Sequence, residues 1–236
     1  MTPFYRFARV LVRVLLPLQM RLSVVGVERC PRSGPLVIVG NHLGLVDPLP
    51  IGLRIPRQVH FVAKSDLFEW PILGGLSRWC GVVPVHRGAS DREAIRTLAD
   101  LLARGQCVML MPEGTYPKVP LPAAMLRARS GAAFLALRAG AMVLPVGITG
   151  TERVWSPSRG WRIWHRARVT VTFGEPYMPR APAGLSAKAS NQMVADDMGR
   201  RIAVLLPEAY RGYYADQVAA PAGILPSDWG IRGDTQ

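Results

Sequence analysis

The stretch LVIVGNHLGLVDP, residues 36–48, joins an uninterrupted apolar run to a polar segment that ends at a proline. The run Leu36–Gly40 is short and apolar throughout, which predicts a strand that is buried on both faces. Similar runs recur at Cys107–Met111, Met142–Gly147 and Val169–Phe173. Helices are predicted at Gly131–Ala139 and Ala187–Leu206. This alternation predicts an α/β fold with a mainly parallel sheet flanked by helices.

Two other segments have less regular patterns. Ser90–Glu93 forms a capping box, which predicts a helix that begins there and ends near Arg104. The segment Leu67–Trp79 contains Pro71 and a pair of glycines at 74 and 75. Because proline and glycine disfavour helix interiors, we expect this segment to be interrupted.

His42 and Asp47 lie just beyond the strand predicted at Leu36–Gly40. Ligands of open α/β sheets bind at the carboxyl ends of the strands, so this is a suitable position for a site. An imidazole can remove a proton from a hydroxyl group, and an aspartate on its other nitrogen fixes the tautomer and stabilises the imidazolium. A histidine and an aspartate at this spacing are more often structural, so the pair alone does not establish catalysis.

Polar residues follow two further predicted strands. Met111–Thr115 comes directly after the apolar run Cys107–Met111, and Arg87 lies just past the short run Val82–Val85. Three strands therefore end in a histidine–aspartate pair, an arginine and a glutamate–glycine turn. This combination is typical of a site that combines acid–base chemistry with phosphate binding.

The charge of the chain is strongly positive, with 29 basic against 16 acidic residues and a net charge of +13. Nearly all of the basic residues are arginines, which suit bidentate binding of phosphate and carboxylate groups. A field of this sign favours nucleic acid, an anionic membrane, a phosphorylated metabolite or an acidic carrier protein. No nucleic-acid recognition motif accompanies the charge, and we expect no nucleic-acid partner.

The N-terminal segment 3–20 has basic and apolar residues at helical spacing. One side would carry Phe4, Phe7, Leu11, Val14, Leu15 and Leu18, and the opposite side Arg6, Arg9 and Arg13. Two interpretations remain open: a helix that lies in a bilayer interface, and a helix that packs its apolar face on the protein's own core. No uncharged apolar run approaches the ~20 residues that a spanning helix needs.

Several classes of site lack support in the sequence. Cys30, Cys80 and Cys107 are widely spaced, which fits neither a disulfide framework nor a zinc site and favours a reducing compartment. We expect the cysteines to be small buried apolar residues. The motifs of dinucleotide, nucleotide-triphosphate, zinc-peptidase and serine-hydrolase sites are absent from the sequence.

Across residues 36–175 the sequence resembles the PlsC-type glycerolipid acyltransferases, which are 1-acylglycerol-3-phosphate acyltransferases and their relatives. Four blocks occur in the family's order: Asn41-His42-x4-Asp47, Gly81–Arg87, Pro112–Thr115 and Val143–Val146. Shorter similarities lie at Phe61–Phe68, Ser130–Ala133 and Gly174–Pro176. Any one block is a weak signal, whereas four in order with suitable spacing are a strong one.

The resemblance implies roles for particular residues. His42 would be the general base and Asp47 its orienting partner. The substrate-binding residues would be Arg87, Glu113, Gly114, Thr115, Lys64 and Asn41, with Gly81, Pro112 and Pro145 structural near the site. No metal, covalent acyl-enzyme or cofactor is implied beyond acyl-ACP (the acyl carrier protein thioester) or acyl-CoA as co-substrate.

The reaction implied is acyl transfer to the sn-2 hydroxyl of 1-acylglycerol-3-phosphate, which gives phosphatidic acid. The expected location is the cytoplasmic face of the membrane, and the expected partners are anionic lipids, a lysophospholipid acceptor and an acyl carrier protein. Two alternatives remain: another lysophospholipid acceptor, and a non-catalytic lipid- or carrier-binding protein.

The sequence departs from the family in the third block. Tyr116-Pro117 stands where the family has Arg-Ser, so a phosphate-binding cation is missing from its expected position. Lys118, Arg127 and Arg129 are the nearby candidates to replace it. A lysophospholipid with a larger head group is therefore an alternative acceptor.

We expect three parts in the chain: a membrane-associating helix at 1–21, an acyltransferase domain at 22–206, and a C-terminal helix and tail at 207–236. Within the domain, Trp155, Trp161 and Trp164 alternate with arginines. This segment is either an interfacial patch, a docking face for the carrier protein or an exposed hairpin.

Overall fold

The computed structural model of the chain describes residues 1–86, 92–117, 124–156, 160–161 and 166–218. A seven-stranded sheet with the order β1-β9-β6-β2-β5-β3-β4 forms its centre. The strands are β1 (Met20–Val25), β2 (Leu36–Gly40), β3 (Val59–Lys64), β4 (Val83–Val85), β5 (Cys107–Leu110), β6 (Met142–Thr149) and β9 (Ala167–Phe173). All neighbouring pairs are parallel except β6 and β9.

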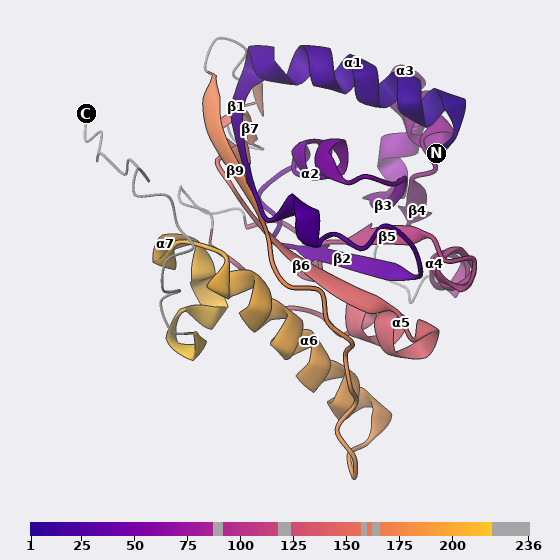
Figure 1. The fold of residues 1–236 in the computed structure, drawn as a ribbon, viewed down its shortest axis with the longest axis vertical. Helices are drawn as coiled ribbons and strands as arrows, with labels where there is room; N and C mark the ends of the chain where they lie inside the picture. Colours follow the sequence, from indigo (N-terminus) through magenta and orange to yellow (C-terminus); the bar gives the residue numbers. More distant parts are fainter. Residues whose placement is uncertain (87–91, 118–123, 157–159, 162–165, 219–236) are drawn as a thin grey trace.

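Helices cover both faces of this sheet. They are α1 (Pro3–Gln19), α2 (Pro48–Arg54), α3 (Pro71–Trp79), α4 (Arg92–Ala103), α5 (Gly131–Ala139), α6 (Ala187–Val204) and α7 (Glu208–Arg211). Figure 1 shows α1 and α2 on one side of the sheet and α5 and α6 on the other. The prediction of an α/β fold with a mainly parallel, helix-flanked sheet is confirmed.

The central strands are apolar throughout because both faces of the sheet are covered. All five residues of β2 are buried, and seven of the eight residues of β6 are buried as well. α5 packs on β2 and α6 packs on β6. The apolar run that begins at Leu36 therefore lies at the middle of the core, and the site that follows it starts from a rigid strand.

The segment Leu67–Trp79 differs from its prediction. A 3₁₀ helix at Ser65–Glu69 is followed by α3, which begins at Pro71 and continues through both glycines. Proline suits the first turn of a helix, where its missing N–H has no intrahelical partner. A Cβ at Gly74 would lie 2.2 Å from the carbonyl oxygen of Phe68, so this glycine allows a close approach of the chain instead of ending the helix.

The apolar face predicted for α1 points away from the core. Phe7, Val14 and Leu18 are each more than 60% exposed, and Leu11 and Leu15 are exposed as well. Of the predicted face, Phe4 is half-buried, and its ring lies 5.3 Å from that of Trp79. The helix is held instead through Tyr5, Ala8 and Leu16, which are buried. The exposed face is therefore not explained by packing on the protein's own core.

No helix in the described ranges is long and apolar enough to cross a membrane. The N-terminal helix α1 ends at Gln19 and leads directly into β1, an edge strand of the sheet. Its 17 residues carry an arginine at three positions, which interrupts any continuous apolar surface around the helix.

The segment with three tryptophans is described only in part. Its described residues form a two-stranded antiparallel hairpin, in which Trp155 pairs with Trp161 and Ser156 with Gly160. Trp164, which was counted in the same segment, lies outside the described residues, as do Ser90 and Asp91 of the predicted capping box.

The C-terminal part packs on the domain as far as the structure describes it. After α7, a 3₁₀ helix spans Gly212–Gln217 and contacts α6. Tyr214 in that helix is fully buried and donates its hydroxyl toward Asp196 of α6. The predicted tail from residue 219 onward lies outside the described residues.

The three cysteines are free, and none pairs with another. Cys30 and Cys107 are buried, whereas Cys80 is half-buried. Burial raises the pKa of Cys107 to about 12, which keeps its thiol protonated. A protonated thiol is a poor nucleophile, so this residue acts as a small apolar side chain of the core.

Candidate active site

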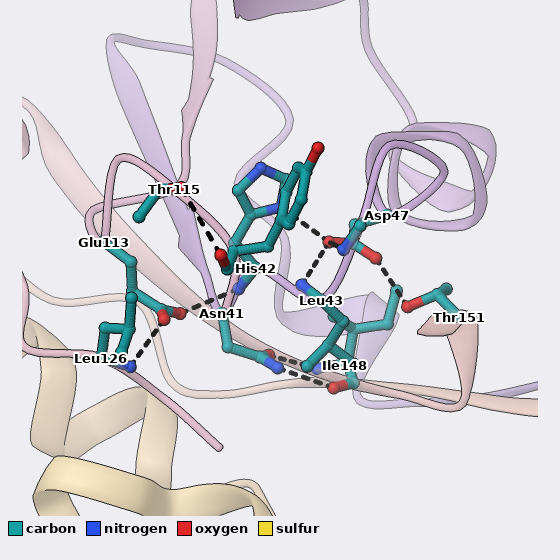
Figure 2. A network of polar contacts seen from close by, with 11 residues as sticks. Asn41, His42, Leu43, Asp47, Glu113, Thr115, Leu126, Ile148 and Thr151 are labelled. Atoms are coloured by element: carbon teal, nitrogen blue, oxygen red, sulfur yellow. Dashed lines mark hydrogen bonds and ion pairs between the residues drawn. The ribbon is translucent and has the colours of Figure 1, made fainter. Parts of the chain in front are cut away.

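Asn41 continues β2 beyond its last residue by bonding to the neighbouring strand. Its Nδ2 donates to the carbonyl oxygen of Ile148 at 2.8 Å, and its Oδ1 accepts from the N–H of Ile148 at 2.7 Å (Figure 2). The side chain is fully buried. Both of its polar atoms are thus directed at β6 rather than toward a ligand, and they fix the point at which His42 leaves the sheet.

His42 and Asp47 lie in direct contact. His42 Nδ1 is 2.8 Å from Asp47 Oδ2. An ionised carboxylate accepts hydrogen bonds only, which assigns the proton of a neutral imidazole to Nδ1 and leaves Nε2 with a lone pair. Nε2 points away from Asp47, and the His42 side chain is 19% exposed. The pair therefore has the tautomer that a general base needs.

Asp47 is fully buried and is held by three further donors. The N–H groups of Leu43 and Gly44 donate to its Oδ2 at 2.7 and 2.8 Å. The hydroxyl of Thr151 donates to Oδ1 at 2.6 Å. Residues 42–47 thus wrap around the carboxylate, and these charge-assisted hydrogen bonds offset the cost of burying it. The role of Thr151 was not predicted from the sequence.

Glu113 connects the His42 loop to a distant segment. Its Oε1 accepts from the backbone N–H of His42 at 2.8 Å, and its Oε2 accepts from the N–H of Leu126 at 2.7 Å (Figure 2). The residue is only 2% exposed. Both oxygens are occupied by the backbone, so the geometry gives Glu113 a positioning role rather than contact with a substrate.

Burial raises the pKa of Glu113 to about 8, while the N–H groups of Leu126 and His42 act in the opposite direction. Between its ordinary value and pH 8, the folded chain binds this proton more tightly than the unfolded chain does. The free energy of unfolding should therefore fall as the pH rises through this range and level off above it. Glu113→Gln should flatten that slope, because the amide does not titrate.

Denaturant unfolding across the same pH range measures this slope directly. The matched control is Glu93→Gln, since Glu93 is exposed on α4 and should leave the slope as it is in the unaltered chain. Glu113→Gln will also lower stability at every pH, because its amide nitrogen meets an N–H donor. The slope is the relevant result. Burial also raises the pKa of Glu152, so part of the slope should remain, and a slope as steep in Glu113→Gln as in the unaltered chain contradicts the assignment.

The Glu-Gly-Thr turn lies beside an arginine that is distant in sequence. Gly114 has a φ of 68°, a conformation that favours glycine, and its N–H donates to the carbonyl of Met111 at 3.0 Å. The N–H of Arg129 donates to the carbonyl of Pro112 at 2.8 Å. A Cβ at Gly114 would lie 3.3 Å from Cδ and 3.7 Å from Cζ of Arg129. The guanidinium is therefore held next to the turn.

Tyr116 packs edge-on against the His42 ring. The ring centroids are 5.0 Å apart and the planes are inclined by 83°. Tyr116 occupies the place of the arginine that the family usually has at this point. An aromatic ring thus takes part in enclosing the imidazole.

The other predicted site residues lie on or next to further strands of the sheet. Lys64 ends β3, two strands from β2, and forms an ion pair with Asp66. Gly81 precedes β4, and its carbonyl lies 2.9 Å from Nδ1 of His60. Pro145 lies in β6 opposite Val39 of β2.

Three more predicted residues are Arg87 of the second block, Thr115 of the third block and Lys118 just after it. Thr115 lies half-buried in the turn after Gly114. Arg87 and Lys118 lie outside the described residues. Within the described ranges, the structure contains no group of three or more His, Cys, Asp and Glu side chains arranged to hold a metal ion.

The chain is similar to known acyltransferases. The family model "Acyltransferase" matches residues 21–149. The 1-acyl-sn-glycerol-3-phosphate acyltransferase of Bacillus subtilis is 27% identical over 199 residues, which cover 84% of this chain and 94% of that protein. A chloroplastic 1-acyl-sn-glycerol-3-phosphate acyltransferase of Arabidopsis thaliana is 28% identical, over 66% of this chain and 43% of the relative.

Two further similarities add a different acceptor and a fold. The lyso-ornithine lipid O-acyltransferase of Pseudomonas aeruginosa is 32% identical over 57% of this chain and 48% of its own length. The crystal structure of the 1-acyl-sn-glycerophosphate acyltransferase PlsC of Thermotoga maritima superposes with a TM-score of 0.65. It is 24% identical and covers 82% of this chain and 75% of that one, a likeness that concerns the fold.

The family match and the site geometry coincide on the same residues. The matched range 21–149 contains the histidine–aspartate pair, the glutamate that anchors the His42 loop and the strand that binds Asn41. This range is more than half of the chain. The chain therefore belongs to the acyltransferase family and is an O-acyltransferase.

Proposed function

We propose that this protein transfers a fatty acyl group from acyl-ACP or acyl-CoA to the sn-2 hydroxyl of 1-acylglycerol-3-phosphate, which gives phosphatidic acid. The observation that carries the proposal is the 2.8 Å contact of His42 Nδ1 with the buried carboxylate of Asp47, since it leaves Nε2 as a base. The relatives from Bacillus subtilis and Arabidopsis thaliana are named for this reaction.

The proposed reaction has two proton transfers and no acyl-enzyme. Nε2 of His42 removes the proton of the acceptor hydroxyl as its oxygen attacks the thioester carbonyl carbon. The C–S bond then breaks, and the departing thiolate takes the proton from the imidazolium to become a thiol. The negative charge of Asp47 stabilises the imidazolium between these two steps, and Thr151 and the loop N–H groups hold that carboxylate in place.

Arg129 is the cation that we propose for the acceptor phosphate, together with Arg87 from the family resemblance. Arg129 is exposed and has no ion-pair partner among the described residues, and its guanidinium lies beside Gly114. Arg127 is engaged elsewhere, because its Nε and Nη2 bind Asp196 at 3.0 and 2.7 Å. Of the described candidates for the missing cation, Arg129 thus has the free charge and the suitable position.

A second acceptor class has a specific observation in its favour. Tyr116 lies against the base, where it offers a neutral hydroxyl in place of a cation. The Pseudomonas aeruginosa relative is named a lyso-ornithine lipid O-acyltransferase. A lysolipid without a phosphomonoester is therefore the alternative acceptor, and it would place less demand on Arg129.

We also propose that the protein works at the cytoplasmic face of a membrane, with the exposed apolar face of α1 in the bilayer interface. This face combines Phe7, Val14 and Leu18 with arginines at its border, a composition typical of interfacial helices. The thioester donor and the lysolipid both carry an acyl chain, so a site beside the bilayer surface would meet both substrates.

An acyl-transfer assay with purified full-length protein tests the function. Labelled acyl-ACP and acyl-CoA are each offered with 1-acylglycerol-3-phosphate, lysophosphatidylcholine and lyso-ornithine lipid. We expect the highest kcat/KM with 1-acylglycerol-3-phosphate. A clearly higher kcat/KM with lyso-ornithine lipid would make that lipid the acceptor in place of 1-acylglycerol-3-phosphate. Absence of transfer to all three acceptors by a folded protein would contradict the proposed reaction.

Within the same assay, Arg129→Ala should raise the KM for 1-acylglycerol-3-phosphate by about 10-fold or more, the equivalent of one charged hydrogen bond. The kcat should change less, because Arg129 is proposed to bind the phosphate and not the reacting hydroxyl. Arg127→Ala removes the same charge two residues away and should leave KM unchanged. A KM that is unaffected by Arg129→Ala would show that another cation binds the phosphate.

A further inference from the structure

Two adjoining hollows lie where α1 meets α2 and β1. One has a volume of about 240 Å³ and is lined by Met1, Arg6, Arg9, Val10, Arg13, Leu53 and Arg54. The other, of about 440 Å³, shares Arg13, Leu53 and Arg54 with the first and is also lined by Arg21 and Arg166. We call the two together the arginine hollow. Among the residues that the structure describes, six arginines and no acidic residue line it, and neither His42 nor Asp47 takes part.

The positive charge of the arginine hollow is not neutralised by the described part of the chain. The side chains of Arg6, Arg13, Arg21, Arg54 and Arg166 have no ion pair or hydrogen bond to any described residue. Arg9 is the exception, since its Nη2 donates to the carbonyl of Leu53 at 2.8 Å and joins α1 to α2. Like charges gathered around one concave surface repel one another, and an anion placed among them relieves that repulsion.

The position of the arginine hollow indicates which kind of anion it holds. At about 100° per residue, Arg6 and Arg13 lie between the buried side of α1 and its exposed apolar face. Val10 lines the hollow and is itself 61% exposed, so the apolar face borders the hollow directly. A soluble phosphate ion would gain nothing from contact with this apolar border. A phospholipid would, because its acyl chains lie beside its phosphate and can contact the apolar face.

We propose that the arginine hollow binds the headgroup phosphate of an anionic phospholipid in the bilayer on which α1 lies. The bound lipid sets the orientation of the protein on the membrane, since Arg13 and Arg54 come from two helices and line both halves of the hollow. This site is distinct from the acceptor site at His42 and Arg129. It rests on the proposed position of α1 in the bilayer interface, but not on the proposed reaction or on the identity of the acceptor.

The test compares two double variants of the full-length protein. Arg13→Gln with Arg54→Gln removes two charges from the hollow, and Arg96→Gln with Arg104→Gln removes two exposed charges at α4. Binding is measured to vesicles of phosphatidylcholine alone and of phosphatidylcholine with phosphatidylglycerol. The hollow pair should weaken binding to the anionic vesicles by about five-fold per arginine. The α4 pair should leave it within a factor of about two, because arginines away from the bilayer add little.

Each other outcome overturns the proposal in a recognisable way. Equal weakening by both pairs would mean a diffuse basic surface, and unchanged binding by the hollow pair would mean that no anion site exists there. Glycerol 3-phosphate in solution should not displace the protein from vesicles, and displacement would assign the hollow to a soluble anion. Acyl transfer in detergent should be unchanged in the hollow pair. A raised acceptor KM there would make the hollow part of the acceptor site.

Discussion

His42→Ala should lower the kcat for acyl transfer by about 10²–10⁴-fold and leave the fold intact, because general acid–base catalysis contributes this much. The half-buried imidazole bonds to Asp47 through its side chain, whereas its backbone N–H, which anchors the loop to Glu113, is kept in the variant. KM should change little, since the ring is proposed to act on the reacting hydroxyl. Steady-state kinetics with circular dichroism measure both properties.

His60 provides a matched control for this substitution. Its ring is also half-buried and also binds through Nδ1, but its partner is the carbonyl of Gly81 at the β3–β4 edge of the sheet. His60→Ala should therefore lower stability and leave kcat close to that of the unaltered protein. Turnover near the unaltered value in a verified His42→Ala protein would rule out His42 as the base.

The sequence predicts the core strand β2 and the helix α5 well because both have an unambiguous pattern. Leu36–Gly40 and Gly131–Ala139 match their predicted ranges residue for residue. The first is followed by Asn41, whose side chain rather than its backbone bonds to β6, and the second ends at Gly140, whose φ is 54°. In both segments the chemistry that ends the element lies in the neighbouring residue, so local information is sufficient.

The partners of the site residues could not be predicted, because they come from distant parts of the chain. Thr151 is 104 residues from Asp47, and the acceptor of the His42 N–H is 71 residues away. Leu126 contributes only its backbone N–H to Glu113, which any residue except proline would offer. Asn41 is a different case. Its position in the motif predicts contact with a ligand, but its side-chain amide bonds to β6 and completes the pairing of β2 with β6.

For α1, the helical periodicity predicts which residues share a face, but not which surface that face contacts. Apolar residues occur around most of the helix, with Tyr5, Ala8 and Leu16 on one side and Phe7, Val14 and Leu18 on another. Either group is suited to burial in the core. The choice depends on the shape of the sheet edge and α2, to which α1 is fastened by Arg9 at Leu53.

Asp47→Asn should lower kcat by about 10²–10⁴-fold with little change in KM, because it removes the charge that stabilises the imidazolium. The amide is the same size as the carboxylate. Its oxygen can keep the hydrogen bonds from His42, Leu43 and Gly44, while its nitrogen donates to a reoriented Thr151 hydroxyl.

The choice of asparagine separates charge from structure. Asp47→Ala would leave the buried N–H groups of Leu43 and Gly44 without an acceptor, at a cost of roughly 1–3 kcal/mol each, and a loss of activity could then reflect a misplaced loop. Asp100→Asn, on the exposed surface of α4, controls for the loss of one negative charge and should leave both constants unchanged. If Asp47→Asn keeps its kcat, the carboxylate serves only to shape the loop, and His42 acts without electrostatic help.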